Sequence, residues 1–182
     1  MFNPKNYEPM HFDTVDRYIS GKLPAVHIGD CFQDRRYQIL NKLGQGGYAN
    51  VWLARDNQTN CNISIKTIAA SDSSNNRELA ILQCLNNGDT QHPGYKHTPR
   101  LLDFFYYDSL SGRSLFLVIE RLGPSLEFMM VEELVLYMRF SLSLSRQVSR
   151  QLLLAVDYLH TCGIVHGDIH LGNVLFCIPT TL

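Results

Sequence analysis

The sequence has no excess of charge of either sign. Its 182 residues include 16 Lys and Arg against 17 Asp and Glu, which gives a formal net charge of −1 when the histidines are neutral. Non-specific nucleic-acid binding depends on a net basic surface. The charge balance therefore argues against that class, and we expect no direct nucleic-acid binding.

Long apolar runs are also missing. The longest cover residues 115–119 and 152–156, well short of the roughly 18 apolar residues that a membrane helix needs. Residues 1–10 carry Asn, Pro, Lys and Glu without an apolar stretch, unlike a secretory signal. From this pattern we expect no membrane partner.

The cysteines lack the spacing of a metal site or a disulfide framework. There are five of them, an odd number, and none belongs to a Cys-x-x-Cys pair. Free thiols in this pattern are typical of a reducing compartment. We therefore expect an intracellular protein of the cytoplasm, the nucleus or both.

What the sequence does have is enough apolar material for a core. Hydrophobic residues make up 45% of the chain and charged residues 18%, which excludes disorder throughout. Residues 1–36 are polar and predict an irregular arm that leads into the fold. A regular pattern begins at Tyr37.

Strand patterns dominate the part that follows Tyr37. Alternating apolar and β-branched residues predict strands over residues 37–43, 49–55, 61–68, 101–106 and 115–121. The last two strands are expected to form a hairpin around residues 109–114. One helix is predicted among these strands, from residue 74 to about residue 85, with Ser73 or Ser74 as its N-cap and Gly88 near its end.

Helical patterns dominate the rest. Residues 146–162 carry one apolar stripe and are expected to form a helix that Gly163 stops. Residues 124–142 are mostly helical by composition, with a weak period. A loop over residues 164–173 and a short strand over residues 174–177 follow. This order predicts an α+β fold with an antiparallel sheet at its N-terminal end.

A glycine-rich segment joins the first two predicted strands. Gly44 and Gly46 match the first two glycines of the pattern G-x-G-x-x-G-x-V, Ala49 replaces the third, and Val51 completes it. Dinucleotide-binding loops lead into a helix, whereas this loop leads into a strand. Glycines between two strands allow backbone N–H groups to approach phosphate oxygens. The alternative is an ordinary hairpin turn.

Lys66 and Glu78 are predicted to pair. Glu78 lies within the apolar face of the helix expected over residues 74–85, about 40° from Leu82 and about 20° from Leu85 on a helical wheel. A carboxylate in that position needs a cation, because an unpaired buried charge is costly. Lys66 on the neighbouring strand is the natural partner, unless the helix end frays and Glu78 reaches water.

The loop after the long helix holds the other candidate residues. Asp168 can orient a hydroxyl and accept its proton, and the amide of Asn173 can bind a metal ion. The spacing of His166 and His170 suggests a zinc site. However, Gly167 between them disfavours the helix that such a site needs, and the sequence contains no H-E-x-x-H motif. For His166 we favour the role of a hydrogen-bonded structural histidine.

Taken together, residues 37–176 are similar to the eukaryotic protein-kinase family. The closer resemblance is to SR-protein-kinase-like serine/threonine kinases, particularly their fungal relatives. It is carried by Val26-His27-Ile28-Gly29-Asp30, Lys42-Leu43-Gly44, His92-Pro93-Gly94 and Glu120-Arg121-Leu122-Gly123-Pro124. It implies a protein-kinase-like fold with an arm (residues 1–36), a complete N-lobe of antiparallel sheet plus one helix (37–121), and only the first part of a helical C-lobe (122–182).

The resemblance also implies ATP and Mg²⁺ as cofactors and assigns roles to residues. Lys66, paired with Glu78, would hold the α- and β-phosphates of ATP, Asp168 would be the catalytic base, and Asn173 would bind magnesium. Ile119 would be the gatekeeper beside the adenine. The other implied nucleotide contacts are Gly44, Gln45, Gly46, Gly47, Val51, Ser64, Glu120 and Leu122.

Three substitutions depart from the family pattern. Ala49 stands for the third glycine, which kinase loops tolerate. Gly167 stands where arginine is common, so control through a phosphorylated activation loop is not expected. His170 stands where protein kinases usually carry lysine, and the resulting H-G-D-x-H-x-x-N is similar to small-molecule phosphotransferases.

The sequence lacks the Asp-Phe-Gly motif that follows Asn173 in the family, and its last residue is Leu182. We therefore expect a truncated ATP-dependent serine/threonine protein kinase with Arg/Ser-rich protein substrates. We expect its activity to be impaired in this chain alone, because one of the two protein ligands of magnesium is missing. The alternatives are a non-catalytic pseudokinase or interaction fragment, and a small-molecule phosphotransferase.

Overall fold

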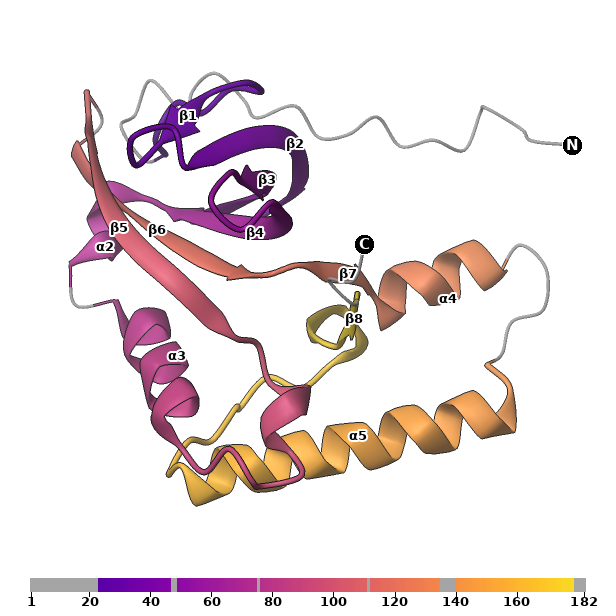
Figure 1. Cartoon of the computed structure of the whole chain (residues 1–182). Coiled ribbons are helices and arrows are strands. Elements are labelled where there is room, and N and C mark those ends of the chain that lie inside the picture. The colour runs from indigo at the N-terminus through magenta and orange to yellow at the C-terminus, as the bar shows by residue number, and fades with distance from the viewer. Residues whose placement is uncertain (1–22, 47–48, 75, 111, 135–139, 179–182) are drawn as a thin grey trace, which may run out of the picture.

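The computed structural model describes residues 23–46, 49–74, 76–110, 112–134 and 140–178. Figure 1 shows a twisted sheet above a long helix, α5 (Leu142–Thr161), with α3 (Arg77–Asn87) joining them at one end. At the other end lie α4 (Leu126–Leu134) and a small sheet of β7 (Leu122–Ser125) and β8 (Leu175–Cys177). Among these helices, none is both long and apolar enough to cross a membrane.

The main sheet is antiparallel throughout and has the strand order β1-β2-β3-β4-β6-β5. Its strands are β1 (Cys31–Phe32), β2 (Tyr37–Gln45), β3 (Ala49–Asp56), β4 (Cys61–Ile68), β5 (Leu101–Ser109) and β6 (Gly112–Glu120). The expected α+β class and N-terminal antiparallel sheet are therefore confirmed. Together with α3 and α5, this sheet gives the described residues the arrangement that the resemblance implies, a sheet with one helix followed by the first part of a helical region.

The two faces of the main sheet have different roles. One face curls around the larger apolar cluster, to which β3 contributes Trp52 and Ala54 and β4 contributes Ile63 and Ile65. On the opposite face, which we call the α3 face, Leu82 of α3 packs against a second cluster that contains Ile68 and Leu117. Because side chains alternate along a strand, Ser64 and Lys66 belong to the α3 face.

Several boundaries differ from the sequence-based expectation. The predicted helix from residue 74 is wrong at its start: α3 begins at Arg77 and is capped by Asn76, whose side chain accepts the N–H of Leu79. Ser73 instead ends a separate short helix, α2 (Ala70–Ser73), where its hydroxyl donates to the carbonyl of Ala69 and accepts the N–H of Leu115. The hydroxyl is therefore committed to a residue of β6 and is not free to cap α3.

The N-terminal arm is also more ordered than expected at its end. Residues 31–32 form β1, which pairs with the start of β2, and Val26 and Phe32 join the larger apolar cluster. An irregular segment is therefore the wrong description of residues 31–32. A two-residue strand has no alternation pattern of its own, so only the pairing with β2 defines it.

Helix α5 is longer than predicted, because it begins at Leu142 with Ser141 as its N-cap. It ends before Gly163, as expected, and Gly163 has the positive φ of +72° that glycine adopts readily. Besides β1 and α2, three further described elements had no sequence prediction. They are β7 and the 3₁₀ turns η2 (Tyr95–His97) and η3 (Leu171–Asn173).

Tyr158 fastens α5 to the end of α3. Its side chain is fully buried with Leu85 and Leu159, and its hydroxyl donates to the carbonyl of Leu85 at 2.6 Å. Gly94 makes the approach possible, because a Cβ at that position would lie 2.7 Å from the carbonyl carbon of Leu154 and 2.8 Å from Cβ of Tyr158. The backbone before η2 therefore lies directly on α5.

We expect Gly94→Ala to destabilise the fold by about 2 kcal/mol or more, because its new methyl group meets backbone that cannot move aside cheaply. Urea unfolding followed by circular dichroism measures the loss. Gly44→Ala is the matched control, since a Cβ at Gly44 meets nothing within 4 Å. Equal stability of the two variants would contradict the close packing of Gly94 on α5.

The buried hydroxyl of Tyr158 also predicts a response to alkaline pH. Burial, with a contribution from the Cys162 thiol, raises the pKa of Tyr158 to about 12. The unfolded chain releases this proton near pH 10, so folding stability should decline as the pH rises from about 10 toward 12. Tyr158→Phe should cost about 1–3 kcal/mol at neutral pH, because the Leu85 carbonyl loses its shorter hydrogen bond and keeps the one from the Gly88 N–H at 3.4 Å.

The same variant should lose less additional stability above about pH 10 than the parent protein does. Urea titrations at several pH values measure both effects. The pKa of Tyr37 is also raised by burial and by Asp103, and both proteins share that contribution. Parallel stability curves for the two proteins above pH 10 would refute the assignment to Tyr158.

Candidate functional site

The glycine turn and the lysine lie side by side on the main sheet. Gly44 of β2 is paired with Val51 of β3, and Val51 is paired with Lys66 of β4. Because directly opposite residues of antiparallel strands point to the same face, the side chains of Val51 and Lys66 share the α3 face. The strand register therefore aligns Gly44 with Lys66. In the sequence, only the spacing between the two residues relates them.

Strands β2 and β3 stay paired up to both ends of the glycine segment. Gln45 is still part of β2 and pairs with Asn50, while the N–H of Gly46 donates to the carbonyl of Ala49 at 2.7 Å. The predicted strand end at residue 43 is therefore too early, because pairing with β3 extends through Gln45. The predicted nucleotide contact Gly47 lies outside the described residues.

Ser64 contributes a polar group to the α3 face. It is opposite Ile119 in the β4–β6 pairing and is only 1% exposed. Within the described part of the chain, its hydroxyl has no hydrogen-bond partner. Buried hydroxyls normally have partners, so the Ser64 hydroxyl is an exception, and it lies next to Ile119, the predicted gatekeeper.

The predicted pair of Lys66 and Glu78 is confirmed as an ion pair. The Lys66 ammonium lies 2.7 Å and 2.8 Å from the two carboxylate oxygens of Glu78. Glu78 comes from the first turn of α3, where a carboxylate also interacts favourably with the helix dipole. Both side chains keep partial solvent contact, at 29% and 40% exposure, so the ammonium is held in place and remains accessible.

Residues 119–122 connect the two sheets: Ile119 and Glu120 end β6, and Leu122 begins β7. Glu120 is tied to the start of β5 by two hydrogen bonds with Arg100: its N–H donates to the Arg100 carbonyl, and its carboxylate accepts the Arg100 N–H at 3.0 Å. Burial raises the pKa of Glu120, and the contacts with Arg100 partly oppose that rise. The backbone N–H of Glu120 is therefore already used, so adenine would have to bind other groups of this segment.

The loop after α5 brings Asp168 and Asn173 together. The Asn173 amide donates to the Asp168 carbonyl at 3.0 Å and to its carboxylate at 3.2 Å. The Asp168 side chain is 78% exposed, so its carboxylate remains open to a substrate. Within the described residues the Asn173 side-chain oxygen accepts no hydrogen bond, and a free amide oxygen is a ligand type that Mg²⁺ accepts.

The two histidines of this loop shape its backbone. His166 Nδ1 accepts the N–H of Asp168 at 3.3 Å, and His170 Nδ1 accepts the N–H of Gly172 at 3.2 Å. These bonds give His166 the structural role that the sequence favours. Gly167 has a positive φ of +74°, so the chain turns between the histidines instead of continuing a helix. His170 Nε2 lies 3.8 Å from the Asp168 carboxylate.

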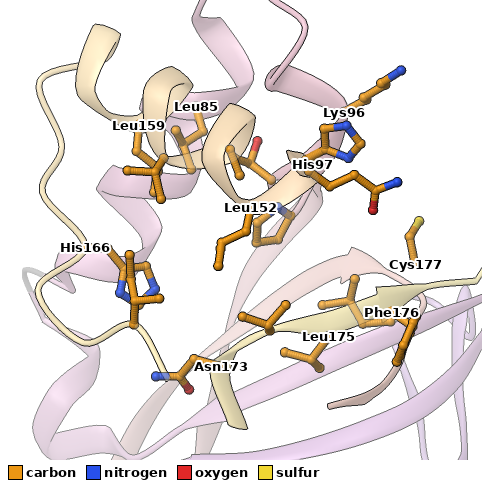
Figure 2. A pocket seen from close by; sticks show the side chains of 18 of the residues that line it. Leu85, Lys96, His97, Leu152, Leu159, His166, Asn173, Leu175, Phe176 and Cys177 are labelled. Atoms are coloured by element: carbon orange, nitrogen blue, oxygen red, sulfur yellow. The ribbon is translucent and has the colours of Figure 1, made fainter. Parts of the chain in front are cut away.

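A cavity of about 810 Å³ lies between α3, α5, η2 and the small sheet. Figure 2 shows Leu85, Leu152 and Leu159 on one side of it, opposite Asn173 and Leu175. The apolar stripe of α5 lines this cavity, so most of that stripe is only partly covered by the described residues.

Only part of the predicted site lines this cavity. Glu78, Glu120, Leu122 and Asn173 do, whereas Lys66, Asp168, Gly44, Gln45, Gly46, Val51 and Ser64 do not. Lys96 and His97 also line it, and they were missed because they lie between the helix predicted over residues 74–85 and the strand predicted over residues 101–106, where no element was predicted. Glu127 of α4 was missed as well: its carboxylate lies against the loop after α5, where a Cβ on Gly172 would be 2.6 Å from it.

Comparison with known proteins gives a consistent result. The protein kinase domain family matches residues 37–180. Protein kinase dsk1 of Schizosaccharomyces pombe is 34% identical over 172 residues, which cover 92% of this chain and 31% of that protein. Serine/threonine-protein kinase SKY1 of Saccharomyces cerevisiae is 33% identical over 90% of this chain and 23% of its own length.

A human relative shows the same relation. SRSF protein kinase 3 of Homo sapiens is 30% identical over 88% of this chain and 29% of its own length. The chain thus spans between 23% and 31% of these three relatives.

The ion pair of Lys66 and Glu78 should contribute little to stability. We expect a double-mutant cycle with Lys66→Met and Glu78→Gln to give a coupling below about 1 kcal/mol, because both groups contact water. Added salt should reduce the coupling further. Urea unfolding of the four proteins measures it. A coupling of several kcal/mol would mean that the pair is structural and that its geometry is not reserved for a ligand.

Proposed function

The chain belongs to the protein kinase domain family and is SR-protein-kinase-like, and from this premise we propose that it acts as an ATP-dependent serine/threonine kinase. In this function a phosphoryl group passes from Mg-ATP to the hydroxyl of a protein serine or threonine. Because the chain covers less than a third of the relatives above, the activity, substrates and partners of the whole protein are all part of this proposal.

The observation that supports the proposal most strongly is the held position of Lys66. Its ammonium is 2.7 Å from Glu78, and its strand register places it in line with Val51 and Gly44. A fixed cation below a glycine turn is suited to the α- and β-phosphates of ATP, which in protein kinases contact a lysine paired with a helix glutamate. We assign Glu120 and Leu122 to the adenine, and we assign Gly44, Gln45, Gly46, Gly47, Val51 and Ser64 as the further nucleotide contacts.

Asp168 is the residue that we assign as catalytic base. Its exposed carboxylate would orient the substrate hydroxyl and accept its proton, while Asn173 holds that carboxylate through its amide N–H at 3.2 Å. The Asn173 side-chain oxygen would bind magnesium. A bound magnesium ion would supply positive charge that neutralises the phosphates. The boundaries of 37–121 for an N-lobe and of 122–182 for the start of a C-lobe belong to this proposal.

The substrates that we propose are Arg/Ser-rich proteins of the cytoplasm or nucleus. This proposal rests on the relatives' names, one of which is an SRSF protein kinase. We further propose that the 182-residue chain alone transfers phosphate slowly. Its sequence contains no Asp-Phe-Gly, and the aspartate of that motif is a magnesium ligand in protein kinases.

Binding of Mg-ATP to the 182-residue chain tests the nucleotide site. We expect Lys66→Met to weaken binding about 10-fold or more, because a charge-assisted contact to phosphate is lost. Arg113→Met removes a positive charge from β6 at a residue that does not line the cavity, and it should leave the affinity unchanged. Titration calorimetry with ATP and magnesium measures both affinities. Equal affinities of the two variants would refute the assignment of Lys66.

Transfer assays then separate the possible functions. Labelling of an Arg/Ser peptide by γ-labelled ATP, abolished by Asp168→Asn, supports the kinase. Nucleotide binding without any transfer, including in a longer form of the protein that carries Asp-Phe-Gly, would favour a pseudokinase. Labelling of amino sugars or small alcohols in place of the peptide would favour a small-molecule phosphotransferase, the class that His170 suggests.

A further inference from the structure

A second, smaller groove adjoins the main cavity between η2 and the first half of α5. It has a volume of about 490 Å³, and its lining includes Lys96, Arg146, Gln147, Arg150, Gln151 and Leu154. Lys96 and both arginines are exposed. Figure 2 shows Lys96 extending away from Leu152 and Leu175 of the main cavity. The groove therefore presents its cations to solvent.

The groove is basic although the whole chain is close to neutral. Lys96, Arg146 and Arg150 each carry a permanent charge, none of them forms an ion pair with another described residue, and no carboxylate lines the groove. On α5 the next carboxylate is Asp157, whose oxygen lies 3.3 Å from His92. Burial lowers the pKa of His97, and nearby Lys96 adds to this effect, so His97 contributes hydrogen bonding without charge near neutral pH.

The spacing of the arginines defines the partner further. Arg146 and Arg150 are one turn apart on α5, which separates them by about 6 Å along the helix. In an extended peptide, side chains on the same side recur about every 6.7 Å. We propose that this groove docks an acidic segment of a partner protein, bound in an extended conformation with carboxylates at alternate positions beside Arg146 and Arg150.

Lys96 contacts the same segment from the opposite wall of the groove. The amides of Gln147 and Gln151 lie on the α5 face that lines the groove, where they bind peptide backbone between the carboxylates. A single-stranded nucleic acid fits less well, because such ligands stack their bases on aromatic side chains and no Phe, Tyr or Trp lines this groove. The recognition is therefore electrostatic and depends on an alternating acidic pattern.

The test uses the full 182-residue chain without nucleotide, so it is independent of the proposed kinase function. The probe is a fluorescent peptide that alternates glutamate and serine, and its affinity is measured by fluorescence polarisation. We expect the double variant Arg146→Glu, Arg150→Glu to bind the probe at least about 10-fold more weakly, since two attractive pairs become repulsive. Raising the ionic strength from about 0.01 M to about 0.1 M should also weaken binding by the parent chain.

Two controls make the result specific. Arg113→Glu changes an exposed arginine of β6 that does not line the groove, and it should retain at least half of the parent affinity. A probe with glutamine in place of glutamate should bind weakly. The proposal fails if the double variant, checked as folded by circular dichroism, binds like the parent, if Arg113→Glu weakens binding equally, or if the two probes bind alike. Tighter binding of oligouridylate through the same arginines would also overturn it, in favour of a nucleic-acid site.

Discussion

The arrangement of the site depends on one buried contact, the hydroxyl of Tyr158 on the carbonyl of Leu85. It closes the end of α3 and at the same time fixes the last turn of α5, from which the Asp168 loop departs. Gly94 lets the backbone lie against α5 at this point. Glu78 lies in the first turn of α3 and Leu85 near its end. The contact of Tyr158 with Leu85 therefore sets the position of the Lys66–Glu78 ion pair relative to the loop that carries Asp168 and Asn173.

The sheet supplies the second constraint. Strand β4 lies between β3 and β6. On one face its side chains belong to the large apolar cluster, and on the other face it carries Ser64 and Lys66. A slip of one residue in the pairing would exchange these faces, burying Lys66 and exposing Ile65. The alternation in β4 therefore sets both the core and the orientation of the cation.

Much of this organisation could be predicted from the sequence, and the failures have a common physical cause. The main strands and the partner of Glu78 follow from local periodicity and from the cost of an isolated carboxylate. The start of α3 did not follow, because Ser73, Ser74 and Asn76 are all suitable caps and only the distant N–H of Leu115 commits Ser73 elsewhere. The η2 wall of the cavity likewise depends on α5, far along the chain, whereas β1 is too short to have a pattern of its own and is defined only by its pairing with the nearby β2.

The position of β4 has a kinetic consequence. Its pairing with β6 joins Ile63 to Glu120 and Ile68 to Leu115, contacts between segments far apart in the chain. Strands β2 to β4 can form early as local hairpins, but their apolar face lacks Phe116 and Val118 until β6 arrives. During synthesis the ribosome must therefore release residues through Glu120 before the core closes, and until then an unpaired edge of β4 is open to association with other chains.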